Sequence, residues 1–162
     1  MALRYIPFVI IIGMCLFCLV QVINKKGKRK EKQPLPIWST VCFWSYLALV
    51  VMITFWSRES GNTTRVDLDL GASLRINSRN DALVVENLLL FIPYGFCYCW
   101  WKEKKEILFT GFMVGLVTSF IIEGMQLVTG RGIFQLDDII MNTLGCMIGA
   151  FSYKLCCILF GK

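Results

Sequence analysis

Five long apolar runs dominate this chain of 162 residues. They cover residues 5–23, 37–56, 82–101, 107–129 and 138–160. Each run is long enough to cross the roughly 30 Å hydrocarbon layer of a membrane, because an α-helix rises about 1.5 Å per residue. Hydrophobic residues make up 56% of the chain and charged residues only 17%, which is more apolar than an ordinary soluble domain. We therefore predict an all-α fold, a polytopic transmembrane helix bundle with about five membrane helices.

The predicted bundle is one membrane domain in two parts. Residues 1–81 hold two helices, a basic inner loop and an outer loop, and residues 82–160 hold the last three helices. The third run is the weakest because it contains Pro93 and Gly95. Proline lacks the N–H that would bond the carbonyl of Leu89, and in lipid that carbonyl needs another partner. A third segment that did not span would reverse the topology of everything after it.

Positive charge between the apolar runs predicts the orientation. The first run is followed by the basic segment 25–32 and preceded only by Arg4, which favours a retained helix over a cleaved signal peptide. A basic loop between two spans is explained by the positive-inside rule, so we expect no nucleic acid partner. With the N-terminus outside, inner segments hold eleven Lys and Arg residues and outer segments six. We predict a multi-pass protein of the cell membrane with the N-terminus outside and the C-terminus inside.

In this topology, polar residues gather at the outer ends of the last three helices. They are Glu86, Asn87, Glu123, Gln126, Arg131, Asp137, Asp138 and Asn142. Asp138, Asn142, Gly145 and Gly149 are spaced 4, 3 and 4 apart, which places them on one helical stripe, whereas Asp137 points about 100° away. We therefore interpret Asp137 as a residue that stabilises the helix start, and Glu123 and Asn142 as deeper residues of a site.

Small residues predict how the last two helices pack. Gly111 and Gly115 form a GxxxG pair, and small residues permit close helix approach in lipid. Because the two helices are antiparallel across a short turn, we expect Gly115 opposite Gly149 and Glu123 near Asn142. Gly145 would lie near Ser119. Asn87 and Tyr94 of the third helix would close the site.

Three segments resemble signature blocks of a known family. They are NLLLFIPYG (87–95), SFIIEGMQ (119–126) and GRGIFQLDDIIMNTLGCMIG (130–149), and together they resemble the VanZ-like family, named for a teicoplanin-resistance protein. The family pattern falls on Asn87, Phe91, Pro93, Gly95, Glu123, Gln126, Arg131, Asp138, Asn142, Gly145 and Gly149. Gln135 stands where many members have an acidic residue, which weakens any mechanism that needs three carboxylates in the turn.

The resemblance implies a bacterial cell-envelope protein that lowers susceptibility to the lipoglycopeptide teicoplanin. We expect its partner to be a membrane lipid or a lipid-linked cell-wall molecule at the outer leaflet. The expected ligand-binding residues are Asn87, Tyr94, Glu123, Gln126, Arg131, Asp138 and Asn142, and the helix-packing residues are Gly111, Gly115, Gly145 and Gly149.

Two other kinds of function stay open at this stage. The protein is an enzyme that modifies a lipid head group if Glu123 or Asp138 acts as a general base or metal ligand. It is a structural subunit if the cluster seats a partner helix. The absence of histidine removes the Cys/His zinc patterns, and no cofactor is required, although an excess of carboxylates suits Mg²⁺ or Ca²⁺.

Overall fold

The computed structural model describes residues 37–56, 66–68, 78–102 and 106–160, and within them the chain is almost entirely helical. The elements are α2 (Ile37–Trp56), β1 (Val66–Asp67), α3 (Ser78–Lys102), α4 (Ile107–Val128), β2 (Phe134–Gln135) and α5 (Leu136–Phe160). Each helix predicted from residue 37 onward is confirmed, with boundaries that differ by at most four residues. The helix predicted at 5–23 and the basic segment 25–32 lie outside the described residues.

The expectation of about five membrane helices is not supported. Among the described helices, α4 and α5 are long and apolar enough to cross a membrane, and the apolar part of α2 is shorter. Helix α3 is less apolar because its first three turns carry Arg79, Asp81 and Glu86, which lower its hydropathy. Length and composition thus identify two candidate spans in this part of the chain.

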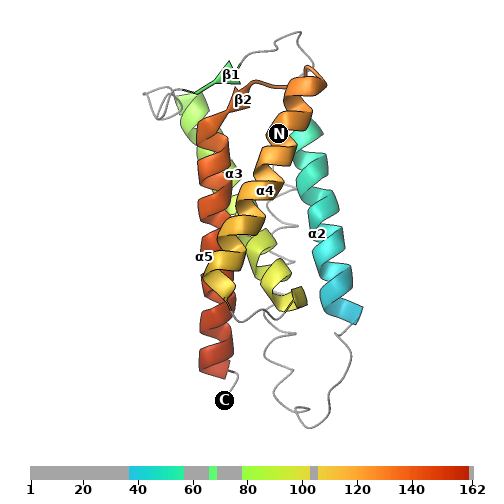
Figure 1. Cartoon of the computed structure of the whole chain (residues 1–162), viewed down its shortest axis with the longest axis vertical. Helices are drawn as coiled ribbons and strands as arrows, with labels where there is room; N and C mark the ends of the chain where they lie inside the picture. The colour runs from blue at the N-terminus through green and yellow to red at the C-terminus, as the bar shows by residue number, and fades with distance from the viewer. Residues whose placement is uncertain (1–36, 57–65, 69–77, 103–105, 161–162) are drawn as a thin grey trace.

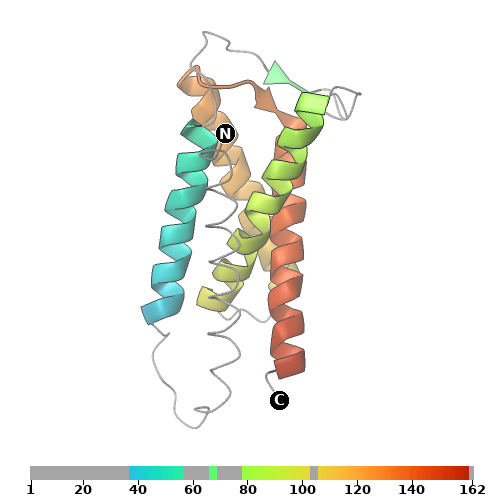
Figure 2. The same ribbon diagram turned by 180° about the vertical axis from the view of Figure 1, so that it is seen from behind.

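The four helices alternate in direction (Figure 1). Helices α2 and α4 run one way and α3 and α5 the other, so that β1 and β2 lie together at one end and the C-terminus lies at the opposite end. Helix α3 packs most extensively against α5, which also packs against α4, while α2 lies mainly on α3 (Figure 2). Residues on α3, α4 and α5 therefore form the compact part of the bundle.

Three glycines allow α3 and α5 to lie in close contact. A side-chain carbon added at Gly149 would meet the Ile92 carbonyl, and one at Gly145 would meet the Leu88 carbonyl. At Gly95 of α3 the added atom would meet the carbonyl of Cys146. The expectation that Gly145 and Gly149 face α4 is therefore wrong, because backbone of α3 occupies that side of α5. They remain helix-packing residues, but with a different neighbour.

The glycines of α4 pack against a second face of α5. An added side-chain carbon at Gly111 would lie 2.7 Å from Cβ of Ala150, and one at Gly115 would lie 2.7 Å from Cβ of Cys146. Gly115 is therefore opposite Cys146, about one helical turn from the expected Gly149. This shift in register also changes which polar residues meet at the end of the two helices.

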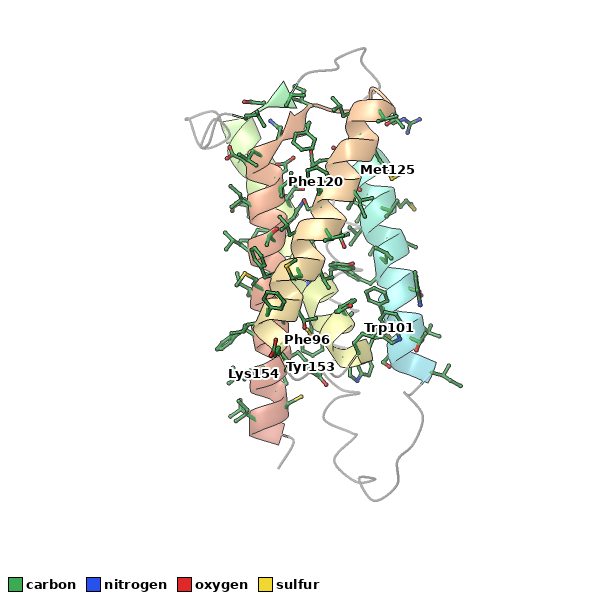
Figure 3. All side chains as sticks on the ribbon, in the orientation of Figure 1. Phe96, Trp101, Phe120, Met125, Tyr153 and Lys154 are labelled. Atoms are coloured by element: carbon green, nitrogen blue, oxygen red, sulfur yellow. The ribbon has the colours of Figure 1, made fainter. Side chains whose placement is uncertain are left out.

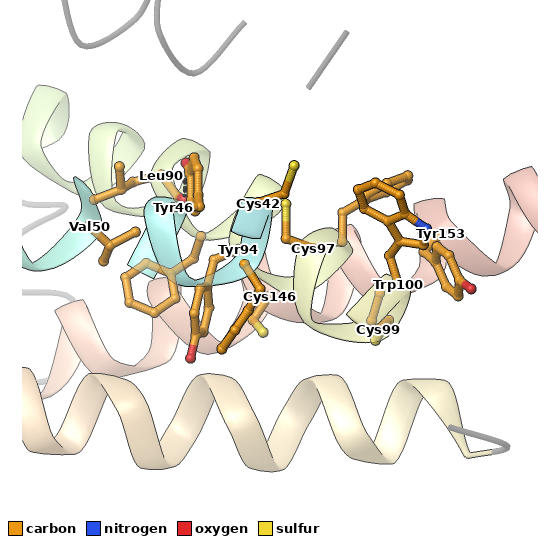
Figure 4. Packing of buried hydrophobic residues seen from close by; sticks show 14 of the residues in the cluster. Cys42, Tyr46, Val50, Leu90, Tyr94, Cys97, Cys99, Trp100, Cys146 and Tyr153 are labelled. Atoms are coloured by element: carbon orange, nitrogen blue, oxygen red, sulfur yellow. Dashed lines mark hydrogen bonds between the residues drawn. The ribbon is translucent and has the colours of Figure 1, made fainter. Parts of the chain in front are cut away.

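Helix α3 continues through Pro93, and a tyrosine from α2 contacts the backbone beside it. The hydroxyl of Tyr46 donates to the carbonyl of Leu90 at 2.8 Å, and the tyrosine itself is fully buried (Figure 4). Proline in a helix removes a backbone donor and disturbs the preceding turn. The Tyr46 hydroxyl therefore supplies a donor in the turn where Pro93 removes one, and it joins α2 to α3.

A short parallel strand pair, which the sequence pattern does not predict, covers the end where the polar residues lie. Val66 pairs with Phe134 and Asp67 pairs with Gln135. The pair joins the connection between α2 and α3 to the connection between α4 and α5 (Figure 1). Two connections far apart in sequence therefore form a common cover over the helix ends.

Aromatic side chains gather toward the opposite end of α2 and α3. Phe43 stacks on Trp101 with ring centroids 4.6 Å apart, and Trp44 contacts the edge of the same indole. The ammonium group of Lys102 lies 3.6 Å from the centre of the Trp101 ring, and Figure 3 shows Trp101 beside α2. Tryptophan and lysine together are typical of the membrane–water interface.

Candidate ligand-binding site

Five polar side chains of α4 and α5 are buried near the end covered by the strands. We call them the polar cluster: Ser119, Glu123 and Gln126 of α4, and Asp138 and Asn142 of α5. None is more than 2% exposed. Acidic side chains are almost never buried to this degree without partners, because losing their hydration is costly. Burial therefore distinguishes these residues from the polar side chains of an ordinary turn.

The cluster extends from the helix ends into the bundle. Asn142 is six residues after Leu136, which places it about 9 Å along α5. Glu123 is five residues before Val128, which places it about 8 Å from the other end of the pair. Gln126 and Asp138 lie in the terminal turns of the same two helices, so the cluster extends from the helix ends to about two turns below them.

Hydrogen bonds connect the cluster to three parts of the fold. The Nδ2 of Asn142 donates to Oγ of Ser119 at 2.8 Å, which joins α5 to α4. The backbone N–H of Gln135 donates to Oε2 of Glu123 at 3.1 Å, which fixes β2 against α4. The Nε2 of Gln126 donates to the carbonyl of Thr54 at 3.2 Å, which joins α4 to the end of α2.

Each of the two amide side chains has one polar atom without a partner. Oε1 of Gln126 and Oδ1 of Asn142 are buried and accept no hydrogen bond from the described part of the chain. A buried polar atom left unpaired costs roughly 1–3 kcal/mol. Two of the three such atoms in the described part of the chain lie in this cluster, the third being Nε1 of Trp100, whereas the buried hydroxyls of Tyr46, Thr54 and Thr143 donate to backbone carbonyls.

The turn between α4 and α5 has a defined geometry that sets the position of Arg131. Gly130 adopts φ +64°, its N–H donates to the carbonyl of Leu127, and the N–H of Arg131 donates to the carbonyl of Gln126. This pair of bonds is a Schellman motif, which glycine favours because it has no Cβ. The motif ends α4 directly above the cluster and leaves the side chain of Arg131 exposed.

The start of α5 carries both aspartates in its first turn. Negative charge there is favourable because the helix dipole is positive at its N-terminus. Asp138 is buried, whereas Asp137 is half-buried. Their different burial agrees with the expectation that the two aspartates are not equivalent.

The other expected site residues lie around the cluster rather than in it. The hydroxyl of Tyr94 is 2.9 Å from that of Thr118, on the part of α4 that faces α2 and α3. Asn87 is half-buried near the start of α3, and the described hydrogen bonds do not join it to the cluster. Among the described residues, no group of three or more His, Cys, Asp or Glu side chains is arranged to hold a metal ion.

Sequence reasoning missed Thr54 and assigned Ser119 only to helix packing. Thr54 meets Gln126 through its backbone carbonyl, which no side-chain pattern reveals. Ser119 was detectable, because it lies one turn before Glu123 on the same face of α4.

The geometry described above can be compared with known proteins. The family model described as VanZ/LLP1 matches residues 43–159, which is well over half of the chain. The chain belongs to the VanZ/LLP1 family. The VanZ/LLP1 match begins within α2, and so it includes a helix that carries none of the motifs on which the resemblance was based. No curated protein and no solved structure matches the chain.

Proposed function

We propose that this VanZ/LLP1 protein is a multi-pass membrane protein of the bacterial cell envelope whose polar cluster binds the polar head of an amphiphilic molecule. The ligand is a membrane lipid or a lipid-linked cell-wall molecule, reached from the outer leaflet. The observation that carries this proposal is the pair of buried, unpaired amide oxygens of Gln126 and Asn142. A ligand that donates hydrogen bonds to them would offset the cost of their burial.

Membrane insertion is supported by the outward faces of the two candidate spans. Large apolar side chains are exposed along both helices: Phe109, Val117 and Phe120 on α4 and Ile148, Phe151 and Leu155 on α5. Such a continuous apolar surface is favourable in hydrocarbon and unfavourable in water. Because α2 and α3 run beside α4 and α5 with alternating direction, we include them among the membrane helices, with the cluster at the outer face.

The atoms of the cluster favour a head group that carries hydrogen-bond donors. Gln126 and Asn142 each present an oxygen, which accepts hydrogen bonds and cannot donate them. Sugar hydroxyls and ammonium groups are donors of this kind. Arg131, exposed in the turn above, can bind a phosphate or carboxylate of the same molecule from the rim. The family resemblance suggests that the physiological outcome is lowered susceptibility to teicoplanin.

The test compares lipid retention and susceptibility in matched variants. In a strain where deletion of the protein changes teicoplanin susceptibility, Asn142→Ala and Gln126→Ala should reproduce the deletion, and Arg131→Ala should have a smaller effect. The same two amide variants, purified in mild detergent, should retain less co-purified lipid by native mass spectrometry. Both variants remove the unpaired oxygen, and membrane levels are checked by immunoblot.

The matched control is Ser152→Ala, which removes a polar side chain from α5 outside the cluster. Ser152 is half-buried, and its hydroxyl donates within its own helix, to the carbonyl of Ile148 at 2.9 Å. It should leave both readouts unchanged. Wild-type susceptibility and wild-type lipid retention in Asn142→Ala and Gln126→Ala, at normal protein levels, would refute the proposal.

A further inference from the structure

A half-open cavity of about 270 Å³ lies between α2, α3 and α4, outside the polar cluster. Leu47 and Val51 of α2 form one wall, Ile122 and Met125 of α4 form the other, and Tyr94 of α3 lies at the back. It is larger than an apolar cavity of roughly 150 Å³ that admits benzene. We call it the α2–α4 groove, and Figure 3 shows Met125 on the side of α4 that faces α2.

The groove is apolar along its walls and polar at its upper end. Leu47, Val51 and Thr54 follow the spacing of one helical face, and Thr118, Ile122 and Gln126 do the same on α4. Thr54 and Gln126 continue these two faces just beyond the residues that line the groove, and the hydrogen bond from Nε2 joins them there. The unpaired Oε1 belongs to the same amide.

The lower end and the opening of the groove are also defined. Phe43 contacts the ring of Tyr94, with centroids 5.8 Å apart, and this contact closes the groove toward the aromatic end of the bundle. At the opening, Val51 is 38% exposed and Met125 is 48% exposed. Both rims are apolar, so the groove opens sideways into hydrocarbon if the helices span the membrane.

The dimensions fit one hydrocarbon chain of one leaflet. From Thr118 to Met125 the lining of the groove extends over seven residues of α4, about 10 Å. One leaflet contributes about half of the roughly 30 Å hydrocarbon layer, or about 15 Å. An acyl chain in the groove would therefore end near the Phe43–Tyr94 contact and begin near Gln126.

We infer that the α2–α4 groove binds an acyl chain of the molecule whose head group the polar cluster holds. The inference rests on the proposed function and adds the chemical class of the ligand: a lipid-linked molecule, rather than a free head group. The chain fills the space between the apolar walls and makes van der Waals contacts with them. Gln126 stands at the junction, with its unpaired oxygen available to the first polar group above the chain.

The test uses a phospholipid probe with a photoreactive diazirine near the middle of one acyl chain, which would lie between the two ends of the groove. The full-length protein is reconstituted in vesicles of phosphatidylcholine and phosphatidylglycerol that contain this probe, irradiated, and mapped by peptide mass spectrometry. Labelling at Leu47, Ile122 and Met125 should exceed labelling at Val117 and Ile148 several-fold. The last two residues are exposed apolar side chains outside the groove and report ordinary contact with the bilayer.

A matched pair of substitutions tests the groove itself. Val51→Trp fills the groove and should remove the excess labelling at Met125, whereas Val41→Trp on another face of α2 should leave it unchanged. Competition is measured on the wild-type protein. Excess unlabelled phospholipid should reduce labelling by the probe, and soluble glycerophosphate should not. Even labelling around the bundle, or equal loss in both tryptophan variants, would overturn the inference.

The outcomes separate this inference from the proposed function. If Asn142→Ala changes susceptibility while labelling is even around the bundle, the head-group site stands and the groove assignment fails. If labelling is concentrated in the groove while Asn142→Ala and Gln126→Ala behave as wild type, the groove stands and the head-group assignment fails.

Discussion

Glu123 has two separate chemical properties in this fold, a hydrogen-bond acceptor and a negative charge. Its Oε2 accepts the backbone N–H of Gln135, so it fixes β2 to α4. A glutamine side chain can also accept that bond, but it carries no charge. The two properties are therefore separable by substitution.

We predict that Glu123→Ala lowers the free energy of unfolding by about 1 kcal/mol, because the part-buried N–H of Gln135 loses its acceptor. Glu123→Gln should cost less than Glu123→Ala. Thermal unfolding in detergent, followed by helical circular dichroism, measures both values. Equal losses for the two variants would show that the charge of Glu123, rather than its acceptor oxygen, stabilises this end of the bundle.

The Asn142–Ser119 bond gives a second prediction for single residues. A double-mutant cycle with Asn142→Ala and Ser119→Ala should give a favourable coupling energy of about 0.6 kcal/mol, a typical value for side-chain hydrogen bonds between membrane helices. The donor–acceptor distance of 2.8 Å is that of a well-formed hydrogen bond, which supports a coupling energy between the two side chains. Additive single-variant effects in the same unfolding assay would contradict it.

Burial of Glu123, Gln126, Asp138 and Asn142 was predictable from position alone. Each lies inside an apolar run at helical spacing, and a polar side chain in that setting must face other helices rather than lipid. Which atoms pair was not predictable. The bond between Asn142 and Ser119 depends on the register of α5 against α4, and a register shift of one turn exchanges the partners.

Helix α5 has two faces made of small residues, and each meets a different neighbour. Gly145 and Gly149 contact backbone carbonyls of α3, whereas Cys146 and Ala150 face the glycines of α4. Small residues permit close approach to any helix, so their spacing identifies an interface without naming the partner. This is why the expected pairing of Gly149 with Gly115 was wrong.

Gly149→Ala should separate α3 from α5. The added Cβ would meet the backbone carbonyl of Ile92, which cannot move as a flexible side chain can. Overpacking of this kind costs about 1–3 kcal/mol, so we expect a loss of that size in the free energy of unfolding. Gly124→Ala is the control, because no atom lies within 4 Å of its added Cβ. A similar loss for both variants would mean that helix flexibility, not close packing, explains the effect.

The helices were predictable from the sequence and the strands were not. Apolar runs of about 20 residues define α2, α4 and α5 because each must bury or embed its length. The strands β1 and β2 are two residues each, too short for any alternation of apolar and polar side chains to appear. Their pairing depends on how the helices bring two distant connections together.

The whole molecule is polar at one end of its helices and aromatic at the other. The polar cluster lies beneath the strands, while Trp101 and Lys102 lie at the far end of α3. The distance along α3 from Glu86 to Trp101 is 15 residues, or about 22 Å. This distance is less than the thickness of the hydrocarbon layer, roughly 30 Å. If Trp101 marks the inner interface, the cluster lies within the outer half of the membrane.

Single cysteines on a cysteine-free background test this orientation. Arg131 and Lys154 are both exposed and lie toward opposite ends of α5. With a membrane-impermeant thiol reagent added to intact cells, Arg131→Cys should be labelled, Gln135→Cys less so, and Lys154→Cys only after the cells are opened. The reverse pattern would place the cluster at the inner face and contradict its access from the outer leaflet.

The strand pair also determines when the site is completed during synthesis. Gln135 follows Asp67, its partner in the sheet, by 68 residues, and both α3 and α4 lie between them. At a typical bacterial rate of about 5–20 residues per second, the ribosome adds those residues in about 3–14 s. During that interval β1 has been made but its partner has not, and Glu123, which precedes Gln135 by 12 residues, is itself made only near the end of it. The cover over the polar cluster is therefore a late step in biogenesis, formed only after the helices beneath it exist.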